Sequence, residues 1–501
     1  MSEKDLGFAE SFDGSFEVSL ADVKARAVRG VVAIMGRGFF IQFVSQISQF
    51  FLLAFLSVDE IGIFWVVSAF VGFLVFFSDI GLAAALIQKK DKPNREDLRT
   101  TFTVQQILVI LLLIFLFLLA PYLRNIYKLS EDGILLIYAL GFSLFLSSLK
   151  SIPSVLLERK LEFSKFIIPD LLESVVYSLL VVFLAWKGFG IKSFAYAVVV
   201  RGLVGVITIY LLQPWRPGFA FSRNSLRGLF SFGIPYQINQ LISIVKDRGV
   251  TLLLGTILGT TGVGYLGTAE RASQIALRQF LDPITKVTFP AFARMQDQKK
   301  ELAESVTRSL MVISFFVFPA VVGLWLTAPL IIRVIPNYSK WEPSLIPLGL
   351  MSINVLFAAV TTQLTNMLAA IGRIKTVSKL MIMWAILTIT LVPGLGYFYG
   401  VNGAALGYAL VSTTSVVAIY IAKKYVNFSI MDSLAKTSLS TIIMAFLILI
   451  SRQFAPPTLL ALIIVVLIGG FSYLGVAYIL MGKALVLDAK KFAKNFFNIG
   501  R

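Results

Sequence analysis

The sequence predicts an all-α polytopic membrane protein with about 14 transmembrane helices. Three observations support this fold class: 57% of the 501 residues are hydrophobic, only 14% are charged, and apolar runs follow one another along the chain. Average soluble domains are about 25% charged, and a soluble fold cannot hide so much apolar surface from water. The chain is therefore expected to fold within a bilayer.

The first 29 residues are expected to stay outside the membrane as a cytoplasmic amphipathic N-terminus. Residues 1–29 carry six acidic and four basic residues and lack the basic-then-apolar pattern of a cleavable signal peptide. Ser19 and Asp22 have the spacing of a capping box, which indicates a short interfacial helix over 21–29.

Fourteen apolar segments follow this N-terminus. A helix needs roughly 20 apolar residues to cross a hydrocarbon core of about 30 Å. Segments of this kind lie near 31–56, 61–87, 101–122, 133–157, 164–186, 192–213, 227–257, 260–290, 305–327, 343–371, 374–399, 401–422, 436–453 and 457–482. The connections between them are short, which leaves no room for a soluble domain.

Short internal matches predict two repeated lobes. Residues 157–165 resemble residues 371–379, 214 positions later, and three further matches have offsets of 198 to 212. A shift of six spans keeps the orientation, so the lobes would be related by a pseudo-two-fold axis along the membrane normal. The predicted parts are an N-lobe of six helices (30–213), a C-lobe of six helices (227–422), an appendage of two helices (436–482) and a basic cytoplasmic tail (483–501).

The formal charge of +18 follows the predicted topology. Lys and Arg concentrate at the N-terminus, at every second connection and at the C-terminus. Cytoplasmic loops are the ones enriched in these residues, so both termini are expected in the cytoplasm. We assign the charge to topology and to contact with anionic lipid head groups, and expect no nucleic-acid partner.

The absence of cysteine and histidine limits the chemistry. It excludes disulfides, thiolate catalysis and zinc–thiolate sites, and it removes the commonest general base and metal ligand. Any acid–base or ion chemistry must therefore use Asp, Glu, Lys, Arg or Tyr. We expect no catalytic residue, no metal site and no bound cofactor. An H+ or Na+ gradient is the candidate energy source for transport.

Charged residues inside the spans predict a polar cavity. A charge at membrane depth costs at least about 2.5–3.5 kcal/mol and usually faces a bundle interior or water. The spans contain eight basic and six acidic residues. A net positive cavity between the lobes suits an anionic substrate, because Arg and Lys donate to phosphate and carboxylate. The candidate substrate-binding cations are Arg37, Arg201, Lys246, Arg248, Arg271 and Arg278.

Four carboxylates are candidates for ion coupling or charge pairing. They are Asp79, Asp247, Glu270 and Asp282. A pair between Asp79 and Arg37 is favoured over a proton or cation site, because membrane charges are normally paired. Two alternatives to a substrate-facing role are a local salt-bridge cluster around Lys246 and an ion ladder along Arg278, Asp282 and Lys286. The ladder would gain only a few tenths of a kcal/mol per ion pair.

Several motifs resemble those of bacterial polysaccharide exporters of the Wzx type, and of their WzxC/TuaB branch. Residues 77–82 (FSDIGL) with 85–88 resemble the second-span signature of these exporters. The signature of span eight in these exporters is similar to residues 264–265, 269–271 and 282–296 of this chain. The opening of span twelve is similar to residues 403–407. These exporters belong to the multidrug/oligosaccharidyl-lipid/polysaccharide exporter superfamily.

The resemblance implies a flippase and not an enzyme. It implies that undecaprenyl-diphosphate-linked oligosaccharide moves from the inner to the outer leaflet of the bacterial cytoplasmic (inner) membrane by alternating access. The motif residues that carry over are Asp79, Glu270, Arg271 and Asp282, although the family usually has a small polar residue in place of Asp282.

The implied partners are the undecaprenyl-diphosphate-linked glycan, membrane lipids, and polysaccharide polymerase or export machinery. Rival functions are a lipid-II-type flippase, a multidrug antiporter of the same superfamily and, with less support, a membrane-embedded glycosyltransferase or polymerase.

Overall fold

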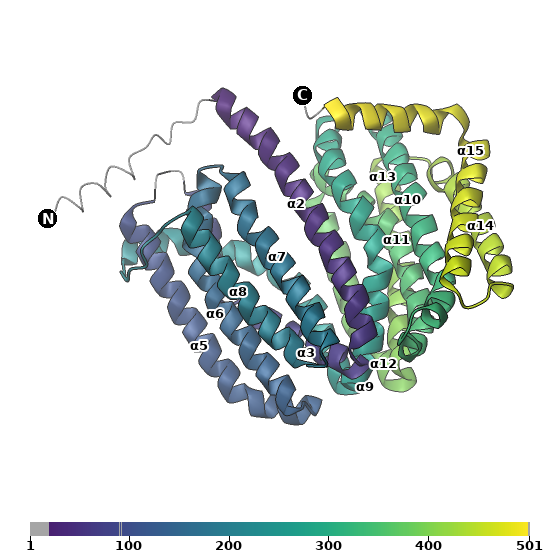
Figure 1. The fold of residues 1–501 in the computed structure, drawn as a ribbon. Coiled ribbons are helices and arrows are strands. Elements are labelled where there is room, and N and C mark those ends of the chain that lie inside the picture. The colour runs from purple at the N-terminus through teal and green to yellow at the C-terminus, as the bar shows by residue number, and fades with distance from the viewer. Residues whose placement is uncertain (1–19, 90, 92, 499–501) are drawn as a thin grey trace. The chain divides into compact units, whose positions relative to one another are not determined.

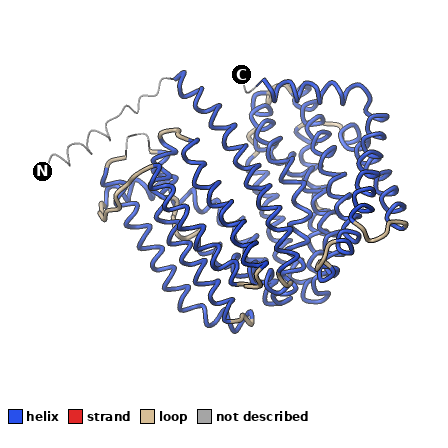
Figure 2. The backbone as a smooth tube through the Cα atoms, viewed as in Figure 1, coloured by secondary structure: helices blue, strands red, loops and turns tan. Residues whose placement is uncertain are grey.

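The computed structural model describes the backbone of residues 20–498 apart from residues 90 and 92 (Figure 1). Most of the predicted N-terminal segment and the last three residues of the predicted tail lie outside this range. Side chains are described from residue 36 to residue 482, apart from residues 90, 92, 163, 224 and 227–243. Every regular element within the described backbone is helical, with no strand (Figure 2).

The helices are α2 (Leu20–Phe55), α3 (Val58–Val75), α4 (Leu82–Gln88), α5 (Arg95–Tyr127), α6 (Glu131–Arg159), α7 (Phe163–Trp186), α8 (Lys192–Leu212), α9 (Arg223–Arg294), α10 (Lys299–Val334), η1 (Ser339–Ser344), α11 (Leu345–Ala370), α12 (Ile374–Thr413), α13 (Ser415–Tyr425), η2 (Met431–Ala435), α14 (Lys436–Gln453) and α15 (Leu459–Asn498).

Twelve helical stretches among the described residues are long and apolar enough to cross a membrane. They confirm the predicted class of multi-pass, all-helical membrane protein. Two of them, Ile244–Arg294 and Ile374–Tyr425, exceed 50 residues, and each contains one glycine with a positive φ, Gly259 or Gly400. Fourteen spans require each of these two stretches to cross twice, and that number stays a prediction.

The α12 helix reverses direction at Gly400. Its φ of 62° and ψ of −146° are accessible to glycine and not to other residues without strain. The segments before and after it lie against each other, since a Cβ atom on Gly407 would be 2.8 Å from the Cα of Val392. Residues 15 positions apart in a straight helix would be about 22 Å apart, so α12 is a helical hairpin.

The predicted second span, 61–87, contains two helices instead of one. The α3 helix ends at Val75, and Gly81, with a left-handed φ of 73°, immediately precedes the first residue of α4. Asp79 Oδ1 accepts a hydrogen bond from the backbone N–H of Ala83 at 3.1 Å. The carboxylate therefore satisfies one of the unpaired N–H groups that open α4.

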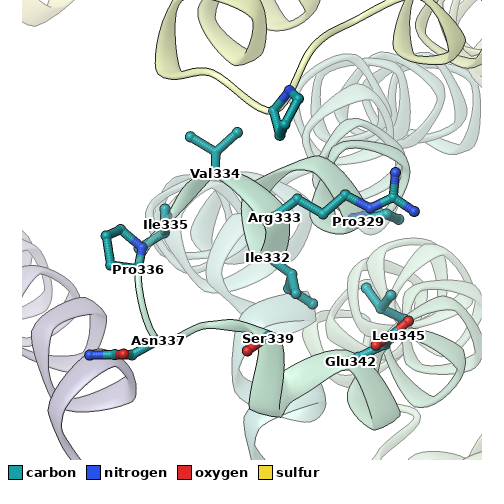
Figure 3. A pocket seen from close by; sticks show the side chains of 11 residues that line it. Pro329, Ile332, Arg333, Val334, Ile335, Pro336, Asn337, Ser339, Glu342 and Leu345 are labelled. Atoms are coloured by element: carbon teal, nitrogen blue, oxygen red, sulfur yellow. The ribbon is translucent and has the colours of Figure 1, made fainter.

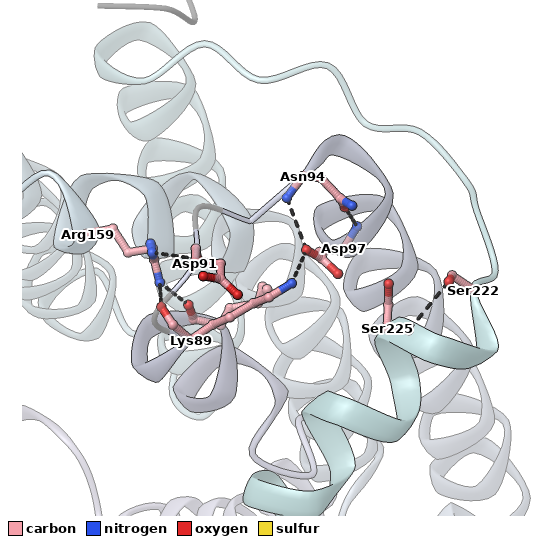
Figure 4. A network of polar contacts seen from close by, with 8 residues as sticks. Lys89, Asp91, Asn94, Asp97, Arg159, Ser222 and Ser225 are labelled. Carbon is pink, nitrogen blue, oxygen red and sulfur yellow. Dashed lines mark hydrogen bonds and ion pairs between the residues drawn. The ribbon is translucent and has the colours of Figure 1, made fainter. Parts of the chain in front are cut away.

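A polar network fixes the connection between α4 and α5 (Figure 4). Arg159 Nη1, at the end of α6, donates to the carbonyl oxygens of Leu86 at 2.6 Å and Lys89 at 2.8 Å. Asp97 is 2% exposed and accepts from Lys89 Nζ at 2.5 Å and from the backbone N–H of Asn94 at 3.0 Å. The carbonyl groups at the end of α4 therefore find a charged donor on another helix.

The chain divides into two compact units. The first comprises residues 1–52 and 70–241, and the second comprises residues 53–69 and 242–501. Within the first unit α6 packs between α5 and α8, and α8 packs on α7 (Figure 1). By packing, the segment 53–69 lies with the second unit, although it falls inside the predicted N-lobe. The lobe boundaries and their symmetry axis stay predictions.

Among the described side chains, an extended buried core lies in the second unit. It contains fully buried residues of α10, α11 and α13, among them Val306, Val317, Leu364 and Ala418. The predicted appendage, α14 and α15, packs on α10 around Met444, Ile448 and Tyr473. In lipid, packing of this kind stabilises mainly through van der Waals contact, because leaving the hydrocarbon gains little.

Candidate functional site

Three helices of the first unit bring cations to α7. Arg37 of α2 pairs with Asp170 of α7, with 2.5 Å between Nη2 and Oδ2. Lys150 of α6 donates to Glu173 of α7, and Arg201 Nε of α8 lies 3.3 Å from the other oxygen of Glu173. The two carboxylates are three residues apart and so lie on one face of α7. We call these five residues the α7 ion cluster.

The α7 ion cluster largely compensates its own charge. The side chain of Glu173 is only 5% exposed, and Asp170 lies within electrostatic reach of all three cations. Arg201 also lies over the ring of Tyr177, 5.7 Å from its centroid. Two of the predicted substrate cations, Arg37 and Arg201, therefore have carboxylate partners, and their role toward a substrate stays a prediction.

The predicted pair between Arg37 and Asp79 is wrong. Arg37 contacts Asp170, and Asp79 caps α4. The prediction placed α2 beside α3 because they are neighbours along the chain. In the structure both residues lie in the first unit, but Asp79 lies beyond the end of α3 at Val75 and accepts from the backbone at the start of α4. Arg37 of α2 pairs instead with Asp170 of α7.

The remaining predicted cations lie on α9, in the second unit. Lys246 pairs with its neighbour Asp247 at 2.6 Å. Arg248, Arg278 and Asp282 are exposed, and no ion pair within 4 Å joins them to the side chains that the structure describes. The alternative of an ion ladder through Arg278 and Asp282 is therefore not formed.

Glu270 connects the two halves of α9 electrostatically. The charges that act on its carboxylate are those of Arg271, Asp247, Lys246 and Arg278. A straight helix would separate Lys246 from Glu270 by about 36 Å. The non-helical backbone at Gly259 brings the two halves together and gathers these charges in one place.

Two aromatic residues of this region were not predicted. The Cζ atom of Arg271 lies 3.4 Å from the ring centroid of Trp65 on α3, which is a cation–π contact. Tyr408 of α12 lies within the field of Glu270 and Asp247. No sequence signal marked Trp65, because one aromatic side chain in an apolar span resembles ordinary core or lipid-facing residues.

A separate cavity of about 630 Å³ lies at the end of α10 (Figure 3). It is lined by Pro329, Ile332, Arg333, Val334, Ile335, Pro336, Asn337, Ser339, Glu342, Leu345 and Pro457. Of the described cations on α9, none lines it, so this cavity is not the predicted anion site. Where side chains are described, no three acidic residues gather as a metal site would require.

Comparison of the sequence with known proteins identifies relatives. The family model described as "Polysaccharide biosynthesis protein" matches residues 51–346. The succinoglycan biosynthesis transport protein ExoT of Rhizobium meliloti is 23% identical over 350 residues, covering 70% of this chain and 69% of that protein. The lipopolysaccharide biosynthesis protein WzxC of Escherichia coli is 23% identical over 353 residues, covering 68% and 70%.

Solved structures share the fold. The lipid II flippase MurJ, in an inward closed conformation, superposes with a TM-score of 0.71 at 17% identity, covering 91% of this chain and all of that one. An inward-facing multidrug resistance MATE transporter of the MOP superfamily gives 0.60 at 15% identity, covering 76% and 94%. The resemblance to Wzx-type exporters is confirmed by the family match, which spans more than half of the chain. The protein therefore belongs to the polysaccharide biosynthesis protein family.

Proposed function

We propose that this protein is a flippase that moves undecaprenyl-diphosphate-linked oligosaccharide from the inner to the outer leaflet of the bacterial cytoplasmic membrane for polysaccharide export. Its family and the names of its relatives, which include a succinoglycan transport protein, support this proposal. The head group crosses by alternating access while the lipid tail stays in the bilayer, so no covalent step is needed.

The observation that carries the proposal is the group of cations on α9. Arg248, Arg271 and Arg278 are exposed, and Lys246 is partly exposed. Guanidinium and ammonium groups are the usual donors to phosphate, and Arg can bind it through two parallel hydrogen bonds. Cations spread over one helix bind a diphosphate without enclosing it, which suits a substrate that must be released.

The proposed setting is the inner membrane, with both termini in the cytoplasm and transport driven by an H+ or Na+ gradient. Polysaccharide polymerase or export machinery would receive the product. Ionophores that collapse one gradient at a time test the energy source in proteoliposomes. Loss of flipping with one ionophore and not the other identifies the ion, and full activity without either gradient contradicts ion coupling.

The central experiment measures flipping of labelled undecaprenyl-diphosphate-linked oligosaccharide in proteoliposomes. We expect the combined variant Lys246→Gln, Arg248→Gln and Arg271→Gln to lose most of the activity. A control variant removes three exposed cations elsewhere, Lys299, Lys300 and Lys375, and should flip at the wild-type rate. A fully active α9 variant would contradict the proposed site.

The same vesicles separate the rival functions. Lipid II carries the same diphosphate, so preference for lipid II over other lipid-linked glycans would favour a lipid-II-type flippase. Transport of a cationic dye such as ethidium, without glycan flipping, would favour a multidrug antiporter. Release of a polymerised or newly glycosylated product would favour a membrane enzyme.

A further inference from the structure

The seam between α3 and α9 is packed backbone to backbone. A Cβ atom on Gly62 of α3 would lie 1.8 Å from the carbonyl oxygen of Thr260 on α9. Further along the seam, a Cβ on Gly267 would lie 3.0 Å from Cδ1 of Trp65. The edge of the indole therefore occupies the space that a side chain at Gly267 would need, which places the ring against α9.

The ring of Trp65 contacts the guanidinium of Arg271. Arg271 is four residues after Gly267 and so lies on the same face of α9. Its guanidinium carbon is 3.4 Å from the centre of the indole, well inside the distance of about 6 Å at which cation–π attraction acts. An aromatic face orients a guanidinium through its ring plane, whereas the carboxylates of the α7 ion cluster orient their cations through ion pairs.

Hydrogen bonding does not account for a tryptophan at this position. Trp65 is 8% exposed, and its indole N–H has no hydrogen-bond partner among the residues that the structure describes. A buried indole N–H usually has a partner, and leaving a buried donor unpaired is unfavourable. The described polar contact of Trp65 is instead the cation–π contact of its ring face with Arg271.

We propose that Trp65 is a positioning residue that holds Arg271 in place to bind the diphosphate of the lipid-linked substrate. This inference rests on the proposed function, and adds to it the residue that sets the geometry of one of its cations. It implies that a phenyl ring can replace the indole, whereas an aliphatic side chain of similar bulk cannot.

The test is binding of farnesyl diphosphate, a short polyprenyl diphosphate, to the full-length purified protein by titration calorimetry. Trp65→Leu should weaken binding about tenfold, which lies between the values for an exposed and for a desolvated cation–π contact, because Trp65 is buried and Arg271 is exposed. Trp65→Phe should weaken it less than about threefold, because no hydrogen bond is lost and a ring face remains. Equal losses in both variants would contradict the role of the ring face.

A double-mutant cycle separates positioning from general stabilisation. In the Arg271→Gln background, Trp65→Leu should have no further effect on farnesyl diphosphate affinity. An equal loss in both backgrounds would mean that Trp65 acts on the fold, and would overturn the inference. If Trp65→Leu does not fold, Trp65→Met, which also removes the ring face, serves in the same cycle.

The two proposals fail in different ways. If Arg271→Gln weakens binding while Trp65→Leu does not, the positioning role of Trp65 is wrong and the proposed anion site stands. If Arg271→Gln leaves binding and flipping unchanged, Arg271 does not bind the diphosphate, and the proposed function loses that residue together with this inference.

Discussion

Glu173 is the residue on which the ion pairs of the first unit converge. Its two oxygens contact Lys150 and Arg201, which come from different helices. Gly205 of α8 leaves the space that this carboxylate fills, since a Cβ there would lie 1.8 Å from Oε1. A carboxylate so enclosed compensates two cations and also fixes the distance between α6, α7 and α8.

Substitution of Glu173 should therefore be costly. Glu173→Gln keeps the size of the side chain but leaves Lys150 and Arg201 without their carboxylate, and breaking a buried pair costs about 3–5 kcal/mol. Because Arg201 is half exposed, we expect the lower end of that range, seen as a lower unfolding temperature in detergent.

A surface ion pair provides the control for Glu173. Glu131, 78% exposed, pairs with Arg124, 48% exposed. Glu131→Gln should cost less than about 1 kcal/mol, because exposed pairs contribute little. Equal unfolding temperatures for the two variants would show that the α7 ion cluster does not hold the helices together.

Which charged residues lie in the spans is visible in the sequence, but their partners are not. Hydropathy reports the surroundings of a segment and the face that it buries, but not which helices are its neighbours. The pair between Arg37 and Asp170 depends on those neighbours, as does the stacking of Arg271 on Trp65. The candidate residues could therefore be predicted while their contacts could not.

At the scale of elements, helix ends are decided by local chemistry. The short helix α4 ends in carbonyl groups that Arg159 of α6 satisfies (Figure 4). Hydrogen bonds from a charged donor contribute about 1.5–3 kcal/mol each. A helix of seven residues cannot persist on its own hydrogen bonds, so α4 depends on this arginine.

Arg159→Gln should therefore loosen α4. We expect amide hydrogen exchange over residues 82–89 to rise at least about tenfold, the equivalent of one charged hydrogen bond. The neighbouring Lys160 donates instead to Gln213 at 3.2 Å. Lys160→Gln should leave exchange in α4 unchanged, and unchanged exchange in Arg159→Gln would mean that α4 is held by its packing alone.

The turns that follow α6 and α11 occupy equivalent positions in the internal repeat, but the sequence match does not give their exact offset. In the connection after α6, the N–H of Glu162 donates to Leu157; after α11, the N–H of Arg373 donates to Leu368 in the same kind of turn. The two turns are thus 211 residues apart, whereas the similar sequences 157–165 and 371–379 are 214 residues apart. The sequence offset aligns identical residues. Equivalent turns are defined by backbone geometry, which different residues can adopt.

For the whole molecule, composition together with the succession of apolar runs of helical length predicts the class of fold. So much apolar surface requires lipid, and in lipid each backbone polar group must be satisfied within a helix or a closed barrel. The division into units is less accessible, because it depends on which helices touch. Residues 53–69 pack with the second unit through contacts such as Gly62 with Thr260, which periodicity does not reveal.

The predicted topology can be tested on the intact protein because the chain contains no cysteine. The α10 helix has 36 residues and is about 54 Å long, enough to cross a core of about 30 Å. Exposed Lys299 at its start should lie in the cytoplasm, and exposed Ser339 beyond its end should lie outside. A membrane-impermeant maleimide should therefore label Ser339→Cys in spheroplasts, and Lys299→Cys only after permeabilisation.

The unmodified protein is the blank in this labelling experiment. The opposite pattern, with Lys299→Cys labelled first, would place the start of α10 outside the cell. The predicted orientation of the chain would then be inverted. Labelling of both variants before permeabilisation would mean that α10 does not cross the membrane, although its composition requires a lipid environment. Because both positions flank one continuous helix of one unit, the result does not depend on how the two units are arranged.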